Sequence, residues 1–428
     1  MKRILYGVLI CALVVGVSVP LLPSSVSAQF TPINIFVDDD FDDDAGLHKW
    51  DTIQEGIDDA RDGVDGVGDT VYVYDGTYTG NIVVDKDILT IHGESSSKVT
   101  VIGGGADHTI TITADDVRVR QLKVTGATGT GWAGVQWGNV ARGYLDHCDI
   151  TGNYFGVLLE SIYNQTIECN NIHNNSNDGI RVRNSTLKDI DRNDISYNRD
   201  GISLENSTKI TIWYNKSHDN SRYGIYVDSS SHDNDIYLND FSDGYSARVQ
   251  ADNNWVTPNQ PVWTDYCYGG GSRSSLRGNY WGDYTGSDTD GDGIGDTLIP
   301  HPLGSESDSL PLIDSYMNYP MGTCPGSLVP ECPGEVAPPS PQPGPACFIA
   351  TAAYGTESAA EIDVLRSFRD EVLLESAVGS QLVEWYYQTS PPVADFISGN
   401  GFLRTMVREL VIDPVVSVAT FTQGMWGK

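Results

Sequence analysis

A repeat of about 22 residues runs through the middle of this chain. Five successive segments begin with a glycine followed by valine or isoleucine, at spacings of 22, 23, 22 and 23 residues. Further apolar positions and asparagines recur at fixed offsets within each segment. A fixed period of this length is typical of solenoids, in which each repeat packs on the next. The segments begin at Gly134, Gly156, Gly179, Gly201 and Gly224.

The apolar positions predict which kind of solenoid forms. They occur in short alternating runs, which favours strands, and strands of neighbouring coils stack about 4.8 Å apart. Two columns would then line the inside of the rod, because alternate residues of a strand share a face. We therefore expect an all-β fold, a right-handed parallel β-helix. The columns are Val135, Val157, Ile180, Ile202 and Ile225, and Trp137, Leu159, Val182, Leu204 and Val227.

Asparagines fill the predicted turns between the strands. Asparagine tolerates the left-handed turn conformation, and stacked amides hydrogen-bond to one another. Two such ladders are expected, Asn170, Asn193, Asn215 and Asn239, and Asn153, Asn175, Asn198 and Asn220.

The flanking parts differ in composition from the repeats. The N-terminus has the basic start, apolar run and small-residue end of a secretory signal peptide, with a retained membrane anchor as the alternative. Ile53 and Ile57 lie on one face of a short amphipathic helix at 51–61, which would cover the apolar end of the rod. The predicted order is signal peptide (1–28), N-terminal cap (29–69), β-helix coils (70–255), C-terminal end with an Asp-rich loop (256–320), Cys/Pro-rich linker (321–346) and small α-helical module (347–428).

Charge narrows the choice of partners. The chain has 58 acidic and 26 basic residues, a net charge of −32, which argues against nucleic acid or an anionic membrane as the partner. After removal of the leader no run reaches the roughly 18 apolar residues of a membrane span, so none is expected. The oligomeric state is left open.

Six cysteines remain after the leader, and an even number in an exported chain permits disulfides. Cys324 and Cys332 are close in sequence and form the predicted local pair. The other pairings are open, and so is the alternative that thiols stay free.

Three segments resemble the NosD-like, pectate-lyase-like β-helix family. They are TIQEGIDDA with GDTVYVYDGTYTGNIVV, the central repeats, and GNYWGDYTGSDTDGDGIGDT at 278–297. The resemblance covers roughly 35–320 and implies the β-helix found in carbohydrate-binding proteins, sugar hydrolases and copper-site maturation proteins. The last module resembles the CFI-box domain, through CFIATAAYGT (347–356), VLRSFRDEVLL (364–374) and YYQTSPPVADFI (386–397). That second resemblance implies surface sorting or retention.

A metal site is predicted in the Asp-rich loop. Alternate carboxylates around a sharp glycine turn can converge on one hard cation, so Ca²⁺ is the expected cofactor. The twelfth position is Ile299 rather than a glutamate, which excludes an EF-hand. The alternative is an acidic turn without an ion. The expected ligands are Asp288, Asp290, Asp292, the carbonyl of Ile294, and Asp296.

The outward face of the coils offers a second candidate site. Carboxylates, guanidinium groups and an aromatic ring on a flat sheet would suit an extended glycan. The carbohydrate-binding candidates are Arg181, Arg183, Glu205 and Tyr226, and the candidates for catalysis are Glu160, Arg183, Glu205 and Asp228. The alternative is a solvated surface of mixed charge.

These features predict a secreted, periplasmic or cell-surface protein that binds carbohydrate or envelope polymers without catalysis. A polysaccharide lyase or glycoside hydrolase is the first alternative, because one or two coils could place two carboxylates at a catalytic separation. Copper-site maturation is the second, and would need imidazole and thiol ligands to converge. Its candidates are His147 and Cys169 on adjacent coils, and His173 and His218. Tyr280, Trp281 and Tyr284 would stack on sugars or plug the end of the rod.

Overall fold

The computed structural model describes most of the rod and a few residues after it. Described are 32–321, with gaps at 42, 187–188, 244, 251, 258–264, 298–300 and 303–305, then 324, 332–339 and some residues within 365–416. The predicted signal peptide and the CFI-box segment at 347–356 lie outside the described residues. The chain divides into two units, one of residues 30–338 and one of 1–29 with 339–428. Within the second unit the structure describes one helix, α7 (Gly401–Val407).

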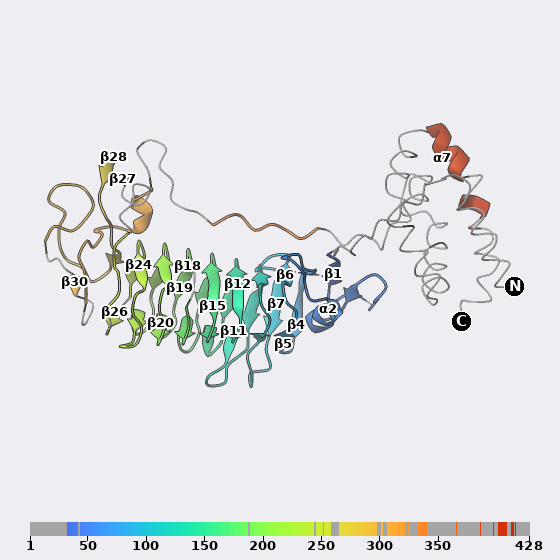
Figure 1. Cartoon of the computed structure of the whole chain (residues 1–428), viewed down its shortest axis with the longest axis horizontal. Coiled ribbons are helices and arrows are strands. Elements are labelled where there is room, and N and C mark those ends of the chain that lie inside the picture. The colour runs from blue at the N-terminus through green and yellow to red at the C-terminus, as the bar shows by residue number, and fades with distance from the viewer. Residues whose placement is uncertain are drawn as a thin grey trace. The chain divides into compact units, whose positions relative to one another are not determined.

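The first unit is a right-handed parallel β-helix, as the repeat predicts (Figure 1). Each coil contributes one strand to each of three parallel sheets, which have ten, nine and eight strands. The ten-stranded sheet contains β2 (Lys49–Trp50), β1 (Asn34–Val37), β3 (Thr70–Val73), β6 (Thr90–Gly93), β9 (Val117–Arg120), β12 (Ala141–Asp146), β15 (Tyr163–Glu168), β18 (Asp189–Asp191), β21 (Thr211–Trp213) and β24 (Asp235–Tyr237). The nine-stranded sheet contains β4 (Gly76–Thr79), β7 (Val99–Ile102), β10 (Lys123–Thr125), β13 (Asp149–Thr151), β16 (Asn171–His173), β19 (Asp194–Ser196), β22 (Lys216–His218), β25 (Asp240–Ser242) and β29 (Tyr280–Trp281). The eight-stranded sheet contains β5 (Ile82–Val84), β8 (Ile110–Ile112), β11 (Ala133–Gly138), β14 (Phe155–Glu160), β17 (Ile180–Arg183), β20 (Asp200–Glu205), β23 (Tyr223–Val227) and β26 (Tyr245–Val249).

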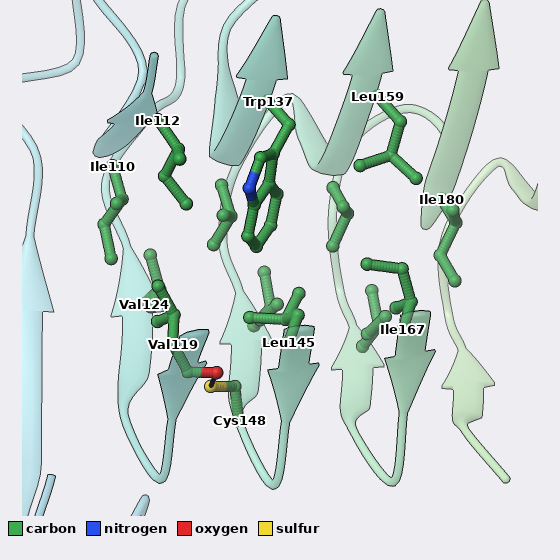
Figure 2. Packing of buried hydrophobic residues seen from close by; sticks show 14 of the residues in the cluster. Ile110, Ile112, Val119, Val124, Trp137, Leu145, Cys148, Leu159, Ile167 and Ile180 are labelled. Carbon is green, nitrogen blue, oxygen red and sulfur yellow. Dashed lines mark hydrogen bonds between the residues drawn. The ribbon is translucent and has the colours of Figure 1, made fainter. Parts of the chain in front are cut away.

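The predicted register is confirmed inside the rod. Val157 pairs with Ile180 and Ile180 with Ile202, so equivalent residues of successive coils stack. Their side chains are fully buried and share one core with the apolar residues of the other two sheets. Figure 2 shows Trp137 and Leu159 from one wall of this core facing Leu145 and Ile167 from another.

Asparagine ladders hold the corners of the coils. Asn170 donates from its side-chain amide to the carbonyls of Leu145 and Glu168 and to Asn193 Oδ1, at 2.9, 2.9 and 3.0 Å. The same pattern repeats at Asn193 and Asn215, so each amide satisfies buried backbone groups of its own coil and of the neighbouring coils.

Both ends of the rod are covered. Helix α2 (Ile53–Asp59) buries Ile53 and Ile57 in the core, and Thr52 caps it by accepting from the Glu55 amide. At the other end, Trp281 is fully buried and stacks on Phe241 with ring centroids 4.9 Å apart. Trp281 is therefore a plug rather than a surface for sugar stacking. The remaining elements beyond it are the hairpin β27 (Asp265–Tyr268) and β28 (Gly271–Ser274), the pair β30 (His301–Pro302) and β31 (Ser307–Asp308), and the 3₁₀ turn η1 (Tyr316–Asn318).

The predicted disulfide between Cys324 and Cys332 is wrong. Cys324 pairs with Cys267 and Cys332 pairs with Cys169. Cys324 joins the hairpin because its amide donates to Ser272 Oγ at 2.9 Å, beside Cys267. Cys332 begins a described segment that also contacts the rod at Gln121.

Residues 332–338, which we call the strap, lie on the rod rather than extending freely from it. The Val336 carbonyl accepts from Gln121 Nε2 and from His92 Nε2, at 3.0 and 2.8 Å. Figure 1 shows this segment in orange running over the coils. The first residues of the predicted linker are thus part of the β-helix unit.

Candidate functional site

The outer face of the eight-stranded sheet brings together most of the predicted carbohydrate-binding residues. Arg183 pairs with Glu160 on one neighbouring strand and Glu205 on the other, as predicted. Arg183 Nε donates to Glu205 Oε2 at 2.9 Å, and Arg181 also donates to Glu205. Glu205 is therefore neutralised by two guanidinium groups.

Asp228 lies apart from this cluster. It follows the last residue of β23 and caps a turn, where its Oδ1 accepts from Ser231 Oγ at 2.7 Å and from the Asn206 amide at 3.2 Å. Its role in the structure is to hold a corner of the coil.

Aromatic rings flank the arginines on both sides. The Arg181 guanidinium lies over the Phe155 ring, 5.2 Å from its centroid. Toward the C-terminal end, Tyr223 stacks on Tyr226, with ring centroids 6.2 Å apart and ring planes 24° apart. Arg222 lies over both rings, at 4.9 and 5.7 Å. Each cation–aromatic contact adds attraction and fixes the arginine in place.

Two aspartates beneath the arginines were missed by the sequence reasoning. Asp178 and Asp200 occupy the same position on adjacent coils and are fully buried. Asp178 accepts from Arg181 Nη1 at 2.7 Å and from Arg199 Nη2 at 3.0 Å, and Asp200 accepts from Arg222 Nε at 2.7 Å. Burial raises the pKa of the Asp178 carboxyl. The signal in the sequence was an aspartate directly before the glycine in two successive coils.

We call this surface the arginine–tyrosine face. Its buried carboxylates hold the guanidinium groups, and the guanidinium groups and tyrosine rings are what a ligand would meet, because Phe155 is buried. Tyr245 extends it by one coil and is 67% exposed. The face consists of Phe155, Asp178, Arg181, Arg183, Arg199, Asp200, Glu205, Arg222, Tyr223, Tyr226 and Tyr245.

The Asp-rich loop brings part of the predicted metal site together. Oxygens of Asp288, Asp290 and Asp296 lie within 4.8 Å of one another. Asp292 is not in this group, because its Oδ1 accepts from the amide of Ile294 at 2.8 Å. The backbone shapes the loop, since both oxygens of Asp288 accept from amides, Gly291 on one and Gly293 on the other, at 2.7 Å each. Three convergent carboxylates are a donor set that suits Ca²⁺.

Two other acidic groups show the same spacing. They are Asp38 with Asp39 and Asp40, and Asp43 with Asp51 and Glu55. Within the described part of the chain, three groups of residues could hold a metal ion, namely the Asp-rich loop and these two, and all three consist of Asp and Glu alone.

The predicted copper ligands are engaged elsewhere. His173 Nε2 contacts Asp149 at 2.7 Å and His218 Nε2 contacts Asp194 at 2.9 Å. Cys169 is in a disulfide, and Cys148 is buried in the core. With both disulfides closed, the described residues therefore bring no imidazole and thiol ligands together.

Solved structures with a similar fold include several polysaccharide enzymes. Pectin methylesterase PemA from Erwinia chrysanthemi is 12% identical, covering 61% of this chain and 92% of that one, with a TM-score of 0.34. Pectate lyase Pel9A is 11% identical, covering 59% and 75%, with a TM-score of 0.39. An alginate lyase from Paenibacillus sp. str. FPU-7 is 13% identical, covering 52% and 99%, with a TM-score of 0.24.

A comparison with curated proteins found no match. Among the described residues, no helix has the length and apolar character needed to cross a membrane.

The profile of one family matches residues 64–286, which is more than half of the chain and includes every strand of the arginine–tyrosine face. That family is described as NosD, periplasmic copper-binding protein, and this chain belongs to it.

Proposed function

We propose that this protein binds an extended polysaccharide on the arginine–tyrosine face and does not cleave it. The observation that carries the proposal is the group of Tyr223, Tyr226 and Tyr245 on two adjacent coils, with the Arg222 guanidinium over the first two rings. Rings present a flat apolar surface to sugar rings, and the arginines present donors to hydroxyl groups. Repetition along the rod suits a polymer.

The three carboxylates of this face are all engaged by arginines, and Glu205 pairs with Arg181 and Arg183. Asp178 and Asp200 are fully buried under Arg181, Arg199 and Arg222, so they are covered from a ligand. A general acid or base must reach the atom whose proton it transfers. This arrangement supports binding without turnover.

A neutral polysaccharide is the preferred ligand class. The arginines are already paired with carboxylates, and the chain carries a net charge of −32. A polyanion such as a polyuronate would be repelled unless Ca²⁺ bridged it. We place the protein in the periplasm or at the cell surface, in accord with the description of its family.

The test is binding of the full chain to a panel of neutral and acidic polysaccharides, measured by affinity electrophoresis and calorimetry. Tyr223→Ala combined with Tyr226→Ala should weaken binding at least tenfold, because two stacking rings are lost. Tyr163→Ala is the matched control, since Tyr163 is 62% exposed but lies on the ten-stranded sheet. Equal loss in the control would contradict the proposed face.

Activity assays separate binding from the enzyme alternative. Reducing ends and unsaturated products should stay at background with every polysaccharide that binds. Cleavage that is abolished by Arg183→Ala or Glu205→Gln would overturn the proposal in favour of a lyase or hydrolase.

A further inference from the structure

A row of equivalent side chains lies along one corner of the rod, where the strap is seated. The residues that precede them pair across β9, β12 and β15, so the members of the row lie on three successive coils, about 4.8 Å apart. In chain order the row consists of Gln121, His147 and Cys169. Each member contacts the strap, and the strap therefore runs along the axis of the rod.

Gln121 binds the backbone of the strap through both ends of its amide. Its Oε1 accepts from the Val336 amide at 3.1 Å, and its Nε2 donates to the Val336 carbonyl at 3.0 Å. The Gln121 side chain is fully buried, and its Nε2 is also 3.3 and 3.1 Å from the carbonyl oxygens of Gly93 and Glu94. It is therefore a fixed group that satisfies the N–H and C=O of one peptide residue. A buried amide that lost these partners would be costly, which favours keeping the position filled.

The backbone contacts of the strap recur after three residues. His147 Nε2 lies 2.5 Å from the Pro333 carbonyl oxygen, and His92 Nε2 lies 2.8 Å from the Val336 carbonyl oxygen. Carbonyls alternate in direction along a β-strand, whereas every third residue of a polyproline II helix faces the same way. Three such residues rise about 9.3 Å, close to the roughly 9.6 Å between coils that are two apart, as those of His92 and His147 are. The row therefore matches the repeat of a polyproline II segment.

Two side chains of the strap add to the fit. Glu335 Oε1 accepts from Ser96 Oγ at 2.9 Å. Pro338 is buried, although the residues on both sides of it are exposed. The contacted pattern is therefore Pro-x-Glu-x-x-Pro, with a free N–H needed at its fourth position for Gln121.

The strap is also held by a disulfide that solvent can reach. Cys332 is exposed and Cys169 is partly exposed. An external thiolate can attack an accessible disulfide. A dithiol supplies two electrons and two protons and becomes a disulfide itself, which leaves Cys169 and Cys332 as thiols. The strap then depends on its noncovalent contacts.

We propose that this row is a binding site for proline-rich peptide segments in the polyproline II conformation. The strap fills the site while the disulfide is closed, and a segment of another protein with the pattern Pro-x-Glu-x-x-Pro fills it after reduction. Such segments are recognised at low entropic cost, because they are already extended before they bind.

The occupant is a different protein rather than a second copy of this chain. A second copy would have to vacate its own identical site to donate a strap, whereas a separate partner carries no such cost. The row lies between the ten- and nine-stranded sheets, so this site is independent of polysaccharide binding on the eight-stranded sheet.

The experiment measures binding of a fluorescent synthetic peptide, with the sequence of residues 333–339, to the full chain by anisotropy. The oxidised chain should not bind it, and the reduced chain should. After reduction the strap still competes, at an effective concentration of roughly millimolar. Cys332→Ser combined with Val336→Pro removes this competition, because proline lacks the N–H that Gln121 accepts. This opened variant should bind the peptide about tenfold more tightly than the reduced wild type does.

Substitutions in the opened variant test the mode of binding. Gln121→Ala should weaken binding about tenfold or more, because both backbone hydrogen bonds are lost. Asn171→Ala is the control, since Asn171 is exposed on the nine-stranded sheet, and should leave binding unchanged. Ser96→Ala and a peptide with alanine in place of glutamate should each weaken binding, and the two losses should not add, because they remove the same contact.

Changes in the peptide test the class of partner. Alanine in place of every proline should weaken binding about tenfold, because the free peptide no longer favours polyproline II. A peptide of otherwise unrelated sequence that keeps Pro-x-Glu-x-x-Pro should bind within about threefold of the first, because the contacts that matter are retained.

Several results would overturn the proposal. They are equal binding to the oxidised chain, indifference to both Gln121→Ala and Ser96→Ala, and equal affinity for the alanine peptide. Dimerisation of the reduced wild type in sedimentation would also overturn it, because the strap of a second copy would then be the occupant. Circular dichroism of each variant checks that the rod is still folded.

Discussion

Burial raises the pKa of several aspartates in the rod, and Asp240 is a clear case. Its carboxylate accepts hydrogen bonds from the Tyr316 amide at 2.8 Å and from Ser315 Oγ at 2.6 Å, and both lower its pKa. Burial removes the carboxylate from water, and this larger effect raises the pKa from 3.8 to about 6. The folded state therefore favours the protonated carboxyl. The contribution of Asp240 to stability is full below about pH 4, falls as the pH rises to about 6, and is constant above that.

Asp240→Asn should therefore stabilise the protein at neutral pH. Asparagine resembles the protonated acid and keeps an acceptor for the Tyr316 amide, so the variant and the wild type should melt together near pH 4. At pH 7.5 the variant should be more stable by up to roughly 2–3 kcal/mol. Thermal melts at both values check this, and a difference independent of pH would contradict it.

At the scale of the element, the asparagine ladder is the feature on which each corner depends. Asn193 donates to the carbonyls of Ile167 and Asp191 and to Asn215 Oδ1, at 2.8, 3.1 and 2.9 Å, and accepts from the Asn170 amide at 3.0 Å. One side chain thus satisfies buried groups of three coils.

Asn193→Ala should lower the free energy of unfolding by roughly 2–4 kcal/mol, because several buried backbone groups lose their partners. Asn171→Ala is the control, since Asn171 is exposed and its side-chain amide donates to Asp149 Oδ1 at 3.2 Å on the surface. Denaturant titration of both variants gives the comparison. A control as unstable as Asn193→Ala would mean that the ladder has no special role.

The Asp-rich loop gives the second prediction at this scale. Calcium should raise the melting temperature, since an ion bound only by the folded chain stabilises it, by about 2.7 kcal/mol at a hundred times its Kd. Asp290→Asn should remove this effect, because Asp290 is one of the three convergent carboxylates. Asp292→Asn should keep it, because Asp292 lies outside that group. Melts indifferent to calcium and to chelator would exclude the site.

At the scale of the whole molecule, the periodic part of the structure could be read from the sequence and the aperiodic part could not. The stacking of Ile180 on Val157, and of Arg183 on Glu160, followed from the repeat alone, because register in a solenoid is set by the period. The pairing of Cys332 with Cys169 did not, because it depends on how a segment without a repeat returns to the rod. The repeat places Asp178 and Asp200 at equivalent positions of successive coils. It does not predict the arginines that cover them, because these come from three different coils.

The strap also decides how the protein would respond to a pulling force. Tension applied after residue 338 meets the rod at Cys332 and passes through the disulfide to Cys169, so the chain between the two cysteines, which are 163 positions apart, carries no load. Stretching the oxidised chain from residue 30 should leave that loop closed. Stretching the reduced chain should release an additional contour length of roughly 54–59 nm, from 3.3–3.6 Å for each step of the 163-position separation. A single-molecule trace with equal contour lengths in both states would show that the disulfide does not divert the force.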